Sequence, residues 1–323
     1  MEQNVMISQA NALTESRYDF NRIEKNALYK IIEKVRHDYI EHPNTKTIEG
    51  FDNLKVSLPA SVLGDITDIR HKDDAHKALV ALRKRDVEIR YEDGSWVNTG
   101  FVNYCKYDAK SDTYEVEVSS EIMPHLVELA RQYTTYSLTV AMALKSIYSQ
   151  RFYELCCQYK NYLEKGGVAG FHKTQDQLRQ MLCLENKYEQ NQDFNRKVVL
   201  RAQEEIKAMY DEGSCDLFFE VQIKGRGRAQ SYDFHIMTRQ LQEQQRLVIE
   251  EARKQWLYIR KRLQASYPRD PKFVERVSHA IELEAASLIR PVFDKIQKLE
   301  SEYKGTDLAR IIRYVLKADF GLS

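Results

Sequence analysis

Turn-forming residues are scarce in this chain of 323 residues, which has 12 Gly and six Pro. Since ordinary proteins contain about 7% Gly and about 5% Pro, this scarcity excludes collagen-like and low-complexity chains and favours a helix-rich protein. No run approaches the about 18 consecutive apolar residues of a membrane span, so no membrane partner is expected. Residues 1–12 are polar and lack the apolar core of a secretory signal, which indicates a cytoplasmic protein.

Cysteine pairs and catalytic motifs are also lacking. The five Cys form no C-x-x-C spacing, and an odd number fits a reducing cytoplasm better than a disulfide framework. The sequence has no phosphate-binding G-x-x-x-x-G-K-[ST] loop, no G-x-S-x-G and no H-E-x-x-H. His71 and His76 lie five residues apart, which does not make the His-x-His metal pair of nicking enzymes. We therefore expect no enzymatic activity, no metal and no cofactor.

Charge of one sign is not in excess, because 49 Lys and Arg stand against 48 Asp and Glu. Any basic surface must therefore be local. The length corresponds to two or three domains at about 100–200 residues each.

Hydrophobic periodicity predicts two units that follow the same order of elements. In the first we expect helices at 21–40, 59–63, 73–85 and 121–132, and strands at 54–58, 88–91, 96–107 and 113–118. In the second we expect helices at 137–163, 174–182 and 193–210, and strands at 168–172, 217–223 and 230–237. Thr174 and Gln177 have the spacing of a capping box, and Asp193 is expected to cap the longer helix.

Each unit has the order of a winged helix, which is a helix-turn-helix followed by a β-hairpin, or wing. The order recurs after about 120 residues, which strengthens the assignment. Three further helices are expected at 241–264, 273–303 and 306–316, with Pro291 at a kink or junction. The predicted fold is α+β and helix-rich. Its parts are an N-terminal winged helix (1–133), a C-terminal winged helix (134–239) and a helical extension (240–323).

The hairpin loop at residues 224–228 carries three cations, Lys224, Arg226 and Arg228, and no acidic residue. Its two Gly let the backbone approach a surface closely, as suits contact with phosphates or the minor groove. An ordinary solvated hairpin turn has the same composition, so this pattern alone leaves both interpretations open.

The helix at 193–210 is expected to be the recognition helix, whose N-terminal part meets base edges in the major groove. Arg pairs with guanine, and Asn or Gln with adenine. A solvated helix face is the alternative, and residues 171–239 hold 11 cations and 11 anions, so the unit has no net charge. If Phe194 and Val198 face inward, the expected DNA-facing residues are Arg196, Lys197, Gln203 and Lys207, with Asn195 and Arg201 nearer the flanks.

Several stretches resemble the initiator (Rep) proteins of iteron-containing plasmids, and residues 21–35 look like the family's first helix. Residues 148–160, YSQRFYELCCQYK, are similar to the family's ys-x-R-x-Y-E-x-x-x-x-Y helix. Residues 193–206, DFNRKVVLRAQEEI, are similar to its dF-x-r-x-vL-x-x-a-x-x-EI helix. Residues 224–226, KGR, and 232–234, YDF, resemble its wing and its closing strand. The resemblance spans about residues 10–237 and is loosest in the first unit.

The resemblance implies two winged-helix domains that bind direct repeats, the iterons, in double-stranded DNA at a plasmid origin. It implies opening of the origin and recruitment of the host initiator and the replicative helicase, without ATPase or nuclease activity. The first domain would contact the other end of the repeat in a monomer and mediate dimerisation during autorepression, which gives a monomer–dimer equilibrium. The resemblance assigns a base contact most firmly to Arg196. Where family members have a run of Arg, this chain has Asn195, Arg196 and Lys197, so Arg196 is the one residue of the three that keeps the family's type.

Two other functions fit the same pattern. A dimeric transcriptional repressor without origin function would use the same domains on inverted half-sites. A protein-interaction module would use the winged helices and the extension, whose 16 Lys and Arg exceed its 12 Asp and Glu.

Overall fold

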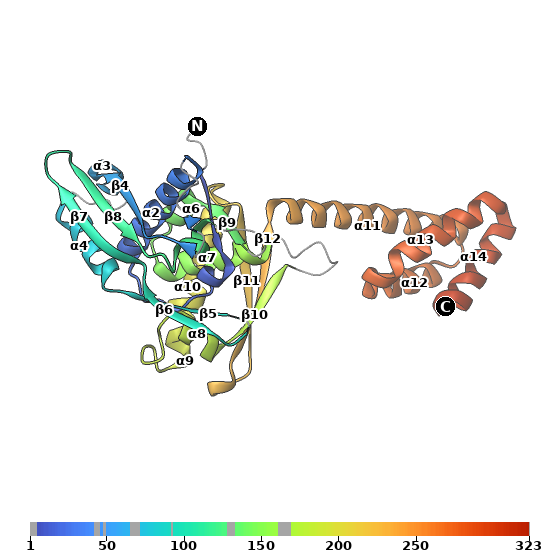
Figure 1. Ribbon diagram of the computed structural model, residues 1–323. Helices are drawn as coiled ribbons and strands as arrows, with labels where there is room; N and C mark the ends of the chain where they lie inside the picture. The colour runs from blue at the N-terminus through green and yellow to red at the C-terminus, as the bar shows by residue number, and fades with distance from the viewer. Residues whose placement is uncertain are drawn as a thin grey trace. The chain divides into compact units, whose positions relative to one another are not determined.

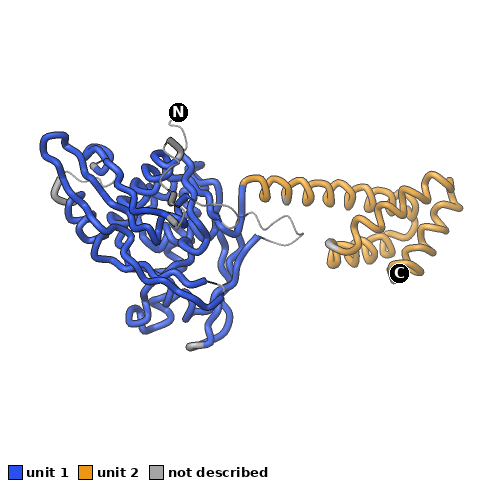
Figure 2. Tube along the Cα trace, viewed as in Figure 1, with its two compact units in different colours: residues 1–238 blue, residues 239–323 orange. Residues whose placement is uncertain are grey.

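The computed structural model describes residues 5–41, 46–47, 50–64, 72–91, 93–127, 133–160 and 169–322. Two compact units are present, residues 1–238 and residues 239–323 (Figure 2). His71 and the expected helix ends at 131–132 and 161–163 lie outside the described residues. The domain boundary expected near residue 134 falls within the first unit and stays a prediction.

The first half of the first unit contains one long helix, several shorter ones and small antiparallel sheets (Figure 1). In chain order its elements are β1 (Met6–Ala10), α1 (Asn11–Thr14), α2 (Arg22–Glu41), β2 (Lys46–Thr47), β3 (Gly50–Phe51), β4 (Leu54–Pro59), α3 (Ala60–Gly64), α4 (Lys72–Arg83), β5 (Asp86–Arg90), β6 (Trp96–Gly100), β7 (Val102–Asp108), β8 (Thr113–Val118) and α5 (Met123–Val127).

The second half repeats the order of a long helix, a strand, two helices and a hairpin. Its elements are β9 (Tyr133–Ser137), α6 (Leu138–Ala143), α7 (Ile147–Tyr159), β10 (Gly170–Thr174), α8 (Gln175–Met181), α9 (Asn191–Phe194), a π-helical segment (Asn195–Leu200), α10 (Arg201–Asp211), β11 (Leu217–Lys224), a 3-10 turn (Gly227–Ala229) and β12 (Ser231–Thr238).

The two halves share one sheet topology, which confirms the predicted repeat. The three-stranded orders are β4-β8-β7 and β10-β12-β11, so in both the short first strand pairs with the last strand of the hairpin. All of these pairs are antiparallel. The first half differs by the hairpin β5–β6, which is inserted between α4 and the wing β7–β8.

Local signals explain where several helices begin. Asn21 and Glu24 exchange hydrogen bonds at the start of α2, because the backbone N–H of Glu24 donates to Asn21 Oδ1 and the N–H of Asn21 donates to Glu24 Oε2. The predicted capping box of α8 is confirmed, with Thr174 and Gln177 satisfying each other's backbone N–H groups.

The prediction of one continuous helix at 137–163 is wrong, because two helices occupy this range. Residues up to Ser137 form β9, which pairs with β1, and α6 and α7 follow as separate helices. The break comes at Leu144 and Ser146, which are extended, and the Ser146 hydroxyl caps α7 by accepting from the N–H of Tyr148. Apolar spacing continues across this break, so periodicity alone did not reveal it.

Each winged helix packs around its own hydrophobic core, and the core of the second also includes residues from the first half of the unit. Ile7 of β1 and Tyr29 of α2 belong to the cluster formed by α7, α10 and the sheet β10-β12-β11. The first cluster lies among α2, α4 and the sheet β4-β8-β7. The two winged helices are therefore packed against each other through α2.

A buried ionic cluster joins α2 to α7. The Lys25 ammonium lies 2.8 Å from the Glu154 carboxylate, and these side chains are 1% and 0% exposed. The Tyr29 hydroxyl donates to Glu154 at 2.8 Å. Arg151 donates to the carbonyl of Ser16 at 2.8 Å. Because charges removed from water are tolerated only when paired, this cluster fixes how the two helices meet.

The second unit is a bundle of four helices. They are α11 (Arg239–Ser266), α12 (Pro271–Leu283), α13 (Ala285–Glu302) and α14 (Gly305–Phe320). Its core includes Ile259, Phe273, Val292 and Ile312. Of the two expectations for Pro291, the junction is wrong, because the chain breaks at Glu284 and Pro291 lies inside α13. The kink stays a prediction.

Candidate nucleic-acid interface

The predicted recognition helix of the second domain is interrupted by its π-helical segment. It begins at Asn191, with Gln190 in the capping position, so the expectation that Asp193 caps it is wrong. Asp193 instead lies in the first turn, where its charge suits the helix dipole. Such π segments often occur at functional sites.

The π segment places two neighbouring valines in the core. Val198 and Val199 are both fully buried, although adjacent residues of an α-helix point in directions about 100° apart. The buried positions Phe194, Val198, Ala202 and Ile206 recur every four residues, which is longer than the about 3.6 of an α-helix. This strict spacing was the sequence signal for a local π turn.

Two cations stand on the exposed face of this segment. The side chains of Arg196 and Lys197 are 70% and 46% exposed, which confirms the expected outward direction. Both contact Asp193, at 2.9 Å and 3.1 Å. The hydrogen bond from Lys197, followed by that from Arg196, lowers the pKa of Asp193. The carboxylate therefore holds both cations near the start of the helix.

The other expected contact residues of this helix differ in accessibility. Arg201 is 64% exposed and lies 4.0 Å from Glu204, and Lys207 is 40% exposed and pairs with Asp211 at 2.5 Å. Gln203 does not project outward as expected, since it is half-buried and its Oε1 is excluded from solvent.

Asn195 is used within the protein. Its Oδ1 accepts a hydrogen bond from the Tyr232 hydroxyl at 2.6 Å, and its Nδ2 donates to Gln230 at 3.4 Å. The amide therefore links the recognition helix to β12, which leaves it less capacity for a base contact.

The wing is held by a shared carboxylate at its base. Asp233 lies 2.5 Å from the Lys224 ammonium and 2.6 Å from His172 Nδ1. The hydrogen bond from Lys224, followed by that from His172, lowers the pKa of Asp233 to about 2. Beyond this base Arg226 is exposed. The backbone of Arg228 lies in the 3-10 turn, and its side chain lies outside the described part of the structure.

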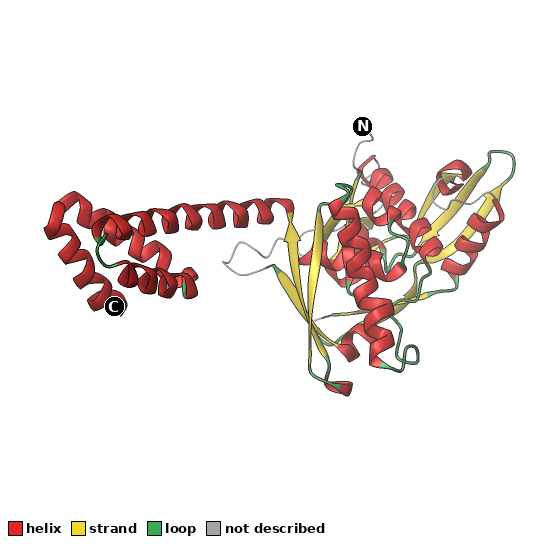
Figure 3. Ribbon diagram, turned by 180° about the vertical axis from the view of Figure 1, so that it is seen from behind, coloured by secondary structure: helices red, strands yellow, loops and turns green. Residues whose placement is uncertain are grey.

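Hydrogen bonds unite the helix and the wing into one surface. Asn191 Nδ2 at the start of the helix donates to the carbonyl of Gly227 at the wing tip, at 2.6 Å. The β11–β12 hairpin extends beyond the body of the domain, with the 3-10 turn at its tip (Figure 3). We call the exposed face of these two connected elements, with Arg196 and Lys197 on the helix and Lys224 and Arg226 on the wing, the helix–wing surface.

A hollow of about 460 Å³ lies on this surface between the helix and the wing. Leu200 and Ile223 line it and are each 36% exposed, and the exposed Gln192 lines it near the helix start. Such apolar groups suit contact with a thymine methyl group, and an amide suits adenine. Sequence reasoning missed these three residues. The sequence feature that could have pointed to Leu200 is its place between two cations, in the run from Lys197 to Arg201.

The corresponding surface of the first domain is less basic. Its wing loop at residues 108–112 contains Asp108 and Asp112. Arg85 pairs with Glu24 at 3.3 Å, and Arg83 donates to the carbonyl of Asn103. The second domain is therefore the better candidate for reading bases.

Family comparisons agree with this geometry. The family described as "Initiator Replication protein, WH1" matches residues 6–157, and the family described as "Initiator Rep protein, WH2" matches residues 174–236. The chain belongs to this family of replication initiators. Its two winged-helix domains are DNA-binding domains of the initiator, and residues 237–323 lie outside both matches.

Other comparisons add little to the family assignment. No curated protein matches the initiator. Among solved structures it is similar to the crystal structure of RctB domains 2-3, with 10% sequence identity and a TM-score of 0.34, over 71% of this chain and 87% of that one.

Neither a membrane-spanning helix nor a metal site is found among the residues that the structure describes. Within those ranges, no helix is both long and apolar enough to cross a membrane. In the same part of the initiator, no group of three or more His, Cys, Asp or Glu side chains could hold a metal ion.

Proposed function

We propose that this initiator binds direct repeats, or iterons, in double-stranded DNA at a plasmid origin. The bound protein opens the origin and recruits the host initiator and the replicative helicase. It works in the cytoplasm without catalysing a reaction of its own, and as a dimer it represses its own gene. The helix–wing surface carries this proposal, because it combines base-reading and phosphate-contacting groups in one interface.

The division of work within the surface follows from the chemistry. The Arg196 guanidinium can donate two hydrogen bonds to the O6 and N7 atoms of guanine, whereas Lys224 and Arg226 on the wing suit phosphates. Since the chain has a net charge of +1, attraction to DNA must come from this local cluster.

A gel-shift titration at near-physiological salt tests the proposal directly. The probe is the DNA that flanks the initiator's own gene, and shuffled DNA is the competitor. We expect a ladder of shifted bands, one for each direct repeat. A single band on an inverted repeat would identify a dimeric repressor instead, and the absence of any specific shift would favour a protein-interaction module.

Arg196→Ala should relax specificity at one base pair of the repeat. Loss of a bidentate contact costs about 1–3 kcal/mol of discrimination, whereas Arg226→Ala should weaken binding to specific and shuffled DNA equally. The measurement is a competition gel shift with each base of the repeat substituted in turn. The control is Arg290→Ala in α13, whose side chain is 84% exposed. Unchanged base preferences in Arg196→Ala would remove Arg196 from the interface.

The mass of the protein in solution tests the proposed monomer–dimer equilibrium. Sedimentation of the full chain should show a monomer–dimer equilibrium that repeat DNA shifts toward the monomer, because a ligand shifts an equilibrium toward the state that it binds better. One mass with and without the repeats would contradict this part of the proposal.

A further inference from the structure

The hollow between the recognition helix and the wing presents an almost entirely apolar surface. Leu200 contributes to it from the π-helical segment and Ile223 from β11, and each of these residues is 36% exposed. A single exposed apolar side chain is ordinary on a protein surface. Here two such side chains, from elements that are apart in sequence, line one hollow within the helix–wing surface.

The register of the wing explains why Ile223 faces the helix. Ile223 pairs with Tyr232 across the hairpin. Residues directly opposite each other in an antiparallel pair lie on the same face of the sheet. Tyr232 is buried, and its hydroxyl donates to Asn195 Oδ1 of the helix at 2.6 Å. Ile223 therefore lies on the face of the wing that meets the helix.

Three of the amide side chains that line the hollow are engaged within the protein. Asn191 donates to the carbonyl of Gly227 at 2.6 Å and accepts from Gln175 at 2.9 Å. Gln230 Oε1 accepts from Asn195 Nδ2 at 3.4 Å. These amides hold the two walls of the hollow together, and the surface that remains for a ligand is apolar.

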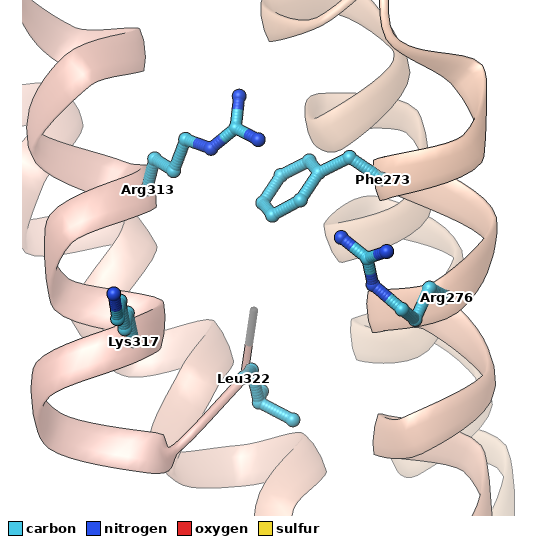
Figure 4. Close-up of a pocket in the computed structure, with 5 residues that line it drawn as sticks. All are labelled: Phe273, Arg276, Arg313, Lys317 and Leu322. Atoms are coloured by element: carbon cyan, nitrogen blue, oxygen red, sulfur yellow. The ribbon is translucent and has the colours of Figure 1, made fainter.

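An apolar lining is not a general property of hollows in this protein. The hollow between α12 and α14 of the second unit has a similar volume, about 490 Å³, and presents a mostly polar surface (Figure 4). It is lined by Phe273, Arg276, Arg313, Lys317 and Leu322. An apolar group therefore fits the hollow between the recognition helix and the wing better than this one.

We propose that the hollow of the helix–wing surface receives the C5-methyl group of a thymine, so that Leu200 and Ile223 select a T·A pair. The recognition helix of such a domain lies in the major groove. There thymine presents a methyl group, whereas the other base edges present hydrogen-bond donors and acceptors. The inference rests on the proposed binding of repeats, since only a defined sequence places one particular base in the hollow.

Arg196 sets where this thymine lies. It lines the same hollow and precedes Leu200 by four residues, which is about one helical turn, or about 5 Å. Successive base pairs are about 3.4 Å apart along the DNA axis. The thymine should therefore lie within about two base pairs of the guanine proposed for Arg196.

The test replaces each thymine of a single repeat by uracil in turn, which removes only the C5-methyl group. Competition gel shifts measure the affinity of the full chain for each probe. We expect one position at which uracil weakens wild-type binding about four-fold, because burial of one methyl group is worth about that factor. Without one apolar wall, Leu200→Ala and Ile223→Ala should each lose less than about two-fold from the same uracil.

The matched control is Leu283→Ala, which shortens a leucine that is 74% exposed at the end of α12. This variant should keep the four-fold loss of the wild type. Because each variant is compared with itself on thymine and uracil probes, a general effect of the substitution on stability cancels.

Three results would overturn the inference. Specific binding in which no thymine is sensitive to uracil would show that the hollow receives no methyl group. An equal uracil effect in the wild type and in both variants would place the methyl contact elsewhere. Equal weakening of both variants on repeat and shuffled DNA, with no dependence on uracil, would assign the hollow to the DNA backbone. The proposed function fails differently, through a lack of preference for the repeats over shuffled DNA, and this inference would then fall with it.

Discussion

At the base of the wing, one carboxylate bonds to two side chains. Asp233 bonds to Lys224 and His172, and its pKa falls to about 2 from an unfolded value of about 3.9. A carboxyl with a lowered folded pKa stabilises the protein above its unfolded pKa. This contribution is complete above about pH 4 and is lost as the pH falls through about 2.

Lys224→Gln should raise the pKa of Asp233 toward 3.9, because Lys224 is the largest cause of the shift. Carboxyl carbon shifts of Asp233 followed by NMR through the acid range measure it. Lys254→Gln, at an exposed position of α11, is the control and should leave the titration unchanged. A titration of Asp233 that is the same in both variants would show that the ion pair does not form in solution.

The sequence predicts which side chains are exposed where the helical periodicity alone sets the direction in which they point. Arg196 and Lys197 were expected on the open face and lie there. Asn195 and Gln203 were not predictable in this way. The partners of Asn195 are Gln230 and Tyr232, which are distant in sequence and reach it only when the hairpin folds back on the helix.

Among the elements, the wing depends on the backbone of Gly225. Its φ is +77°, and an added Cβ would lie 2.4 Å from the carbonyl oxygen of Ala229. Both the left-handed conformation and this backbone clash oppose a side chain. The loop must therefore shift if Gly225 is replaced.

Gly225→Ala should distort the wing tip and weaken binding to specific and shuffled DNA alike. Gly227→Ala is the matched control, because Gly227 also has a positive φ, of +60°, but an added Cβ meets nothing within 4 Å. We expect Gly227→Ala to show only the left-handed penalty of about 1–2 kcal/mol. Thermal unfolding and gel shifts measure the two effects, and equal behaviour of the variants would contradict a role for the clash.

The order of elements was predictable because local patterns specify it. Apolar residues at helical spacing, period-two strands and the Thr174–Gln177 capping box all lie within a few neighbouring residues. The start of α7 was missed because apolar spacing continues across it. The π segment was missed because its four-residue spacing differs only a little from that of an α-helix. Pro291 was expected to mark a kink or a junction, but it lies inside α13 and the break between helices comes at Glu284.

In the first unit as a whole, the cluster around Glu154 couples the two winged helices. Glu154→Gln leaves the Lys25 charge, which is 1% exposed, without its counter-charge. Removing one partner of a buried pair costs about 3–5 kcal/mol. Urea unfolding should therefore show a large loss for this variant.

A double-mutant cycle separates the pair from its surroundings. Lys25→Met with Glu154→Leu should destabilise less than the sum of the single changes, because the buried Lys25 charge is removed together with its partner. Arg151, whose Nη1 lies 3.7 Å from Glu154 Oε2, loses its carboxylate both in Glu154→Leu and in the double variant, so its contribution cancels in the cycle. The control pair Lys30–Glu33 is part-exposed on α2, and its cycle should give about 0–1 kcal/mol. Additive effects at Lys25 and Glu154 would show that they act independently.

The helix–wing surface was predicted in outline from the sequence, because its cations lie in one helix and one loop. A net charge of +1 for the whole chain conceals this local cluster.

The position of β12 also has a mechanical consequence. It is the middle strand of its sheet, paired with β10 over Ser231–Thr174 to His235–Gly170 and with β11 over its full length, and α11 continues directly from its end. Tension applied through α11 would therefore load two ladders of backbone hydrogen bonds at once. A force along β12 would have to shear both together, so the connection to the helical unit should resist pulling better than an edge-strand attachment would.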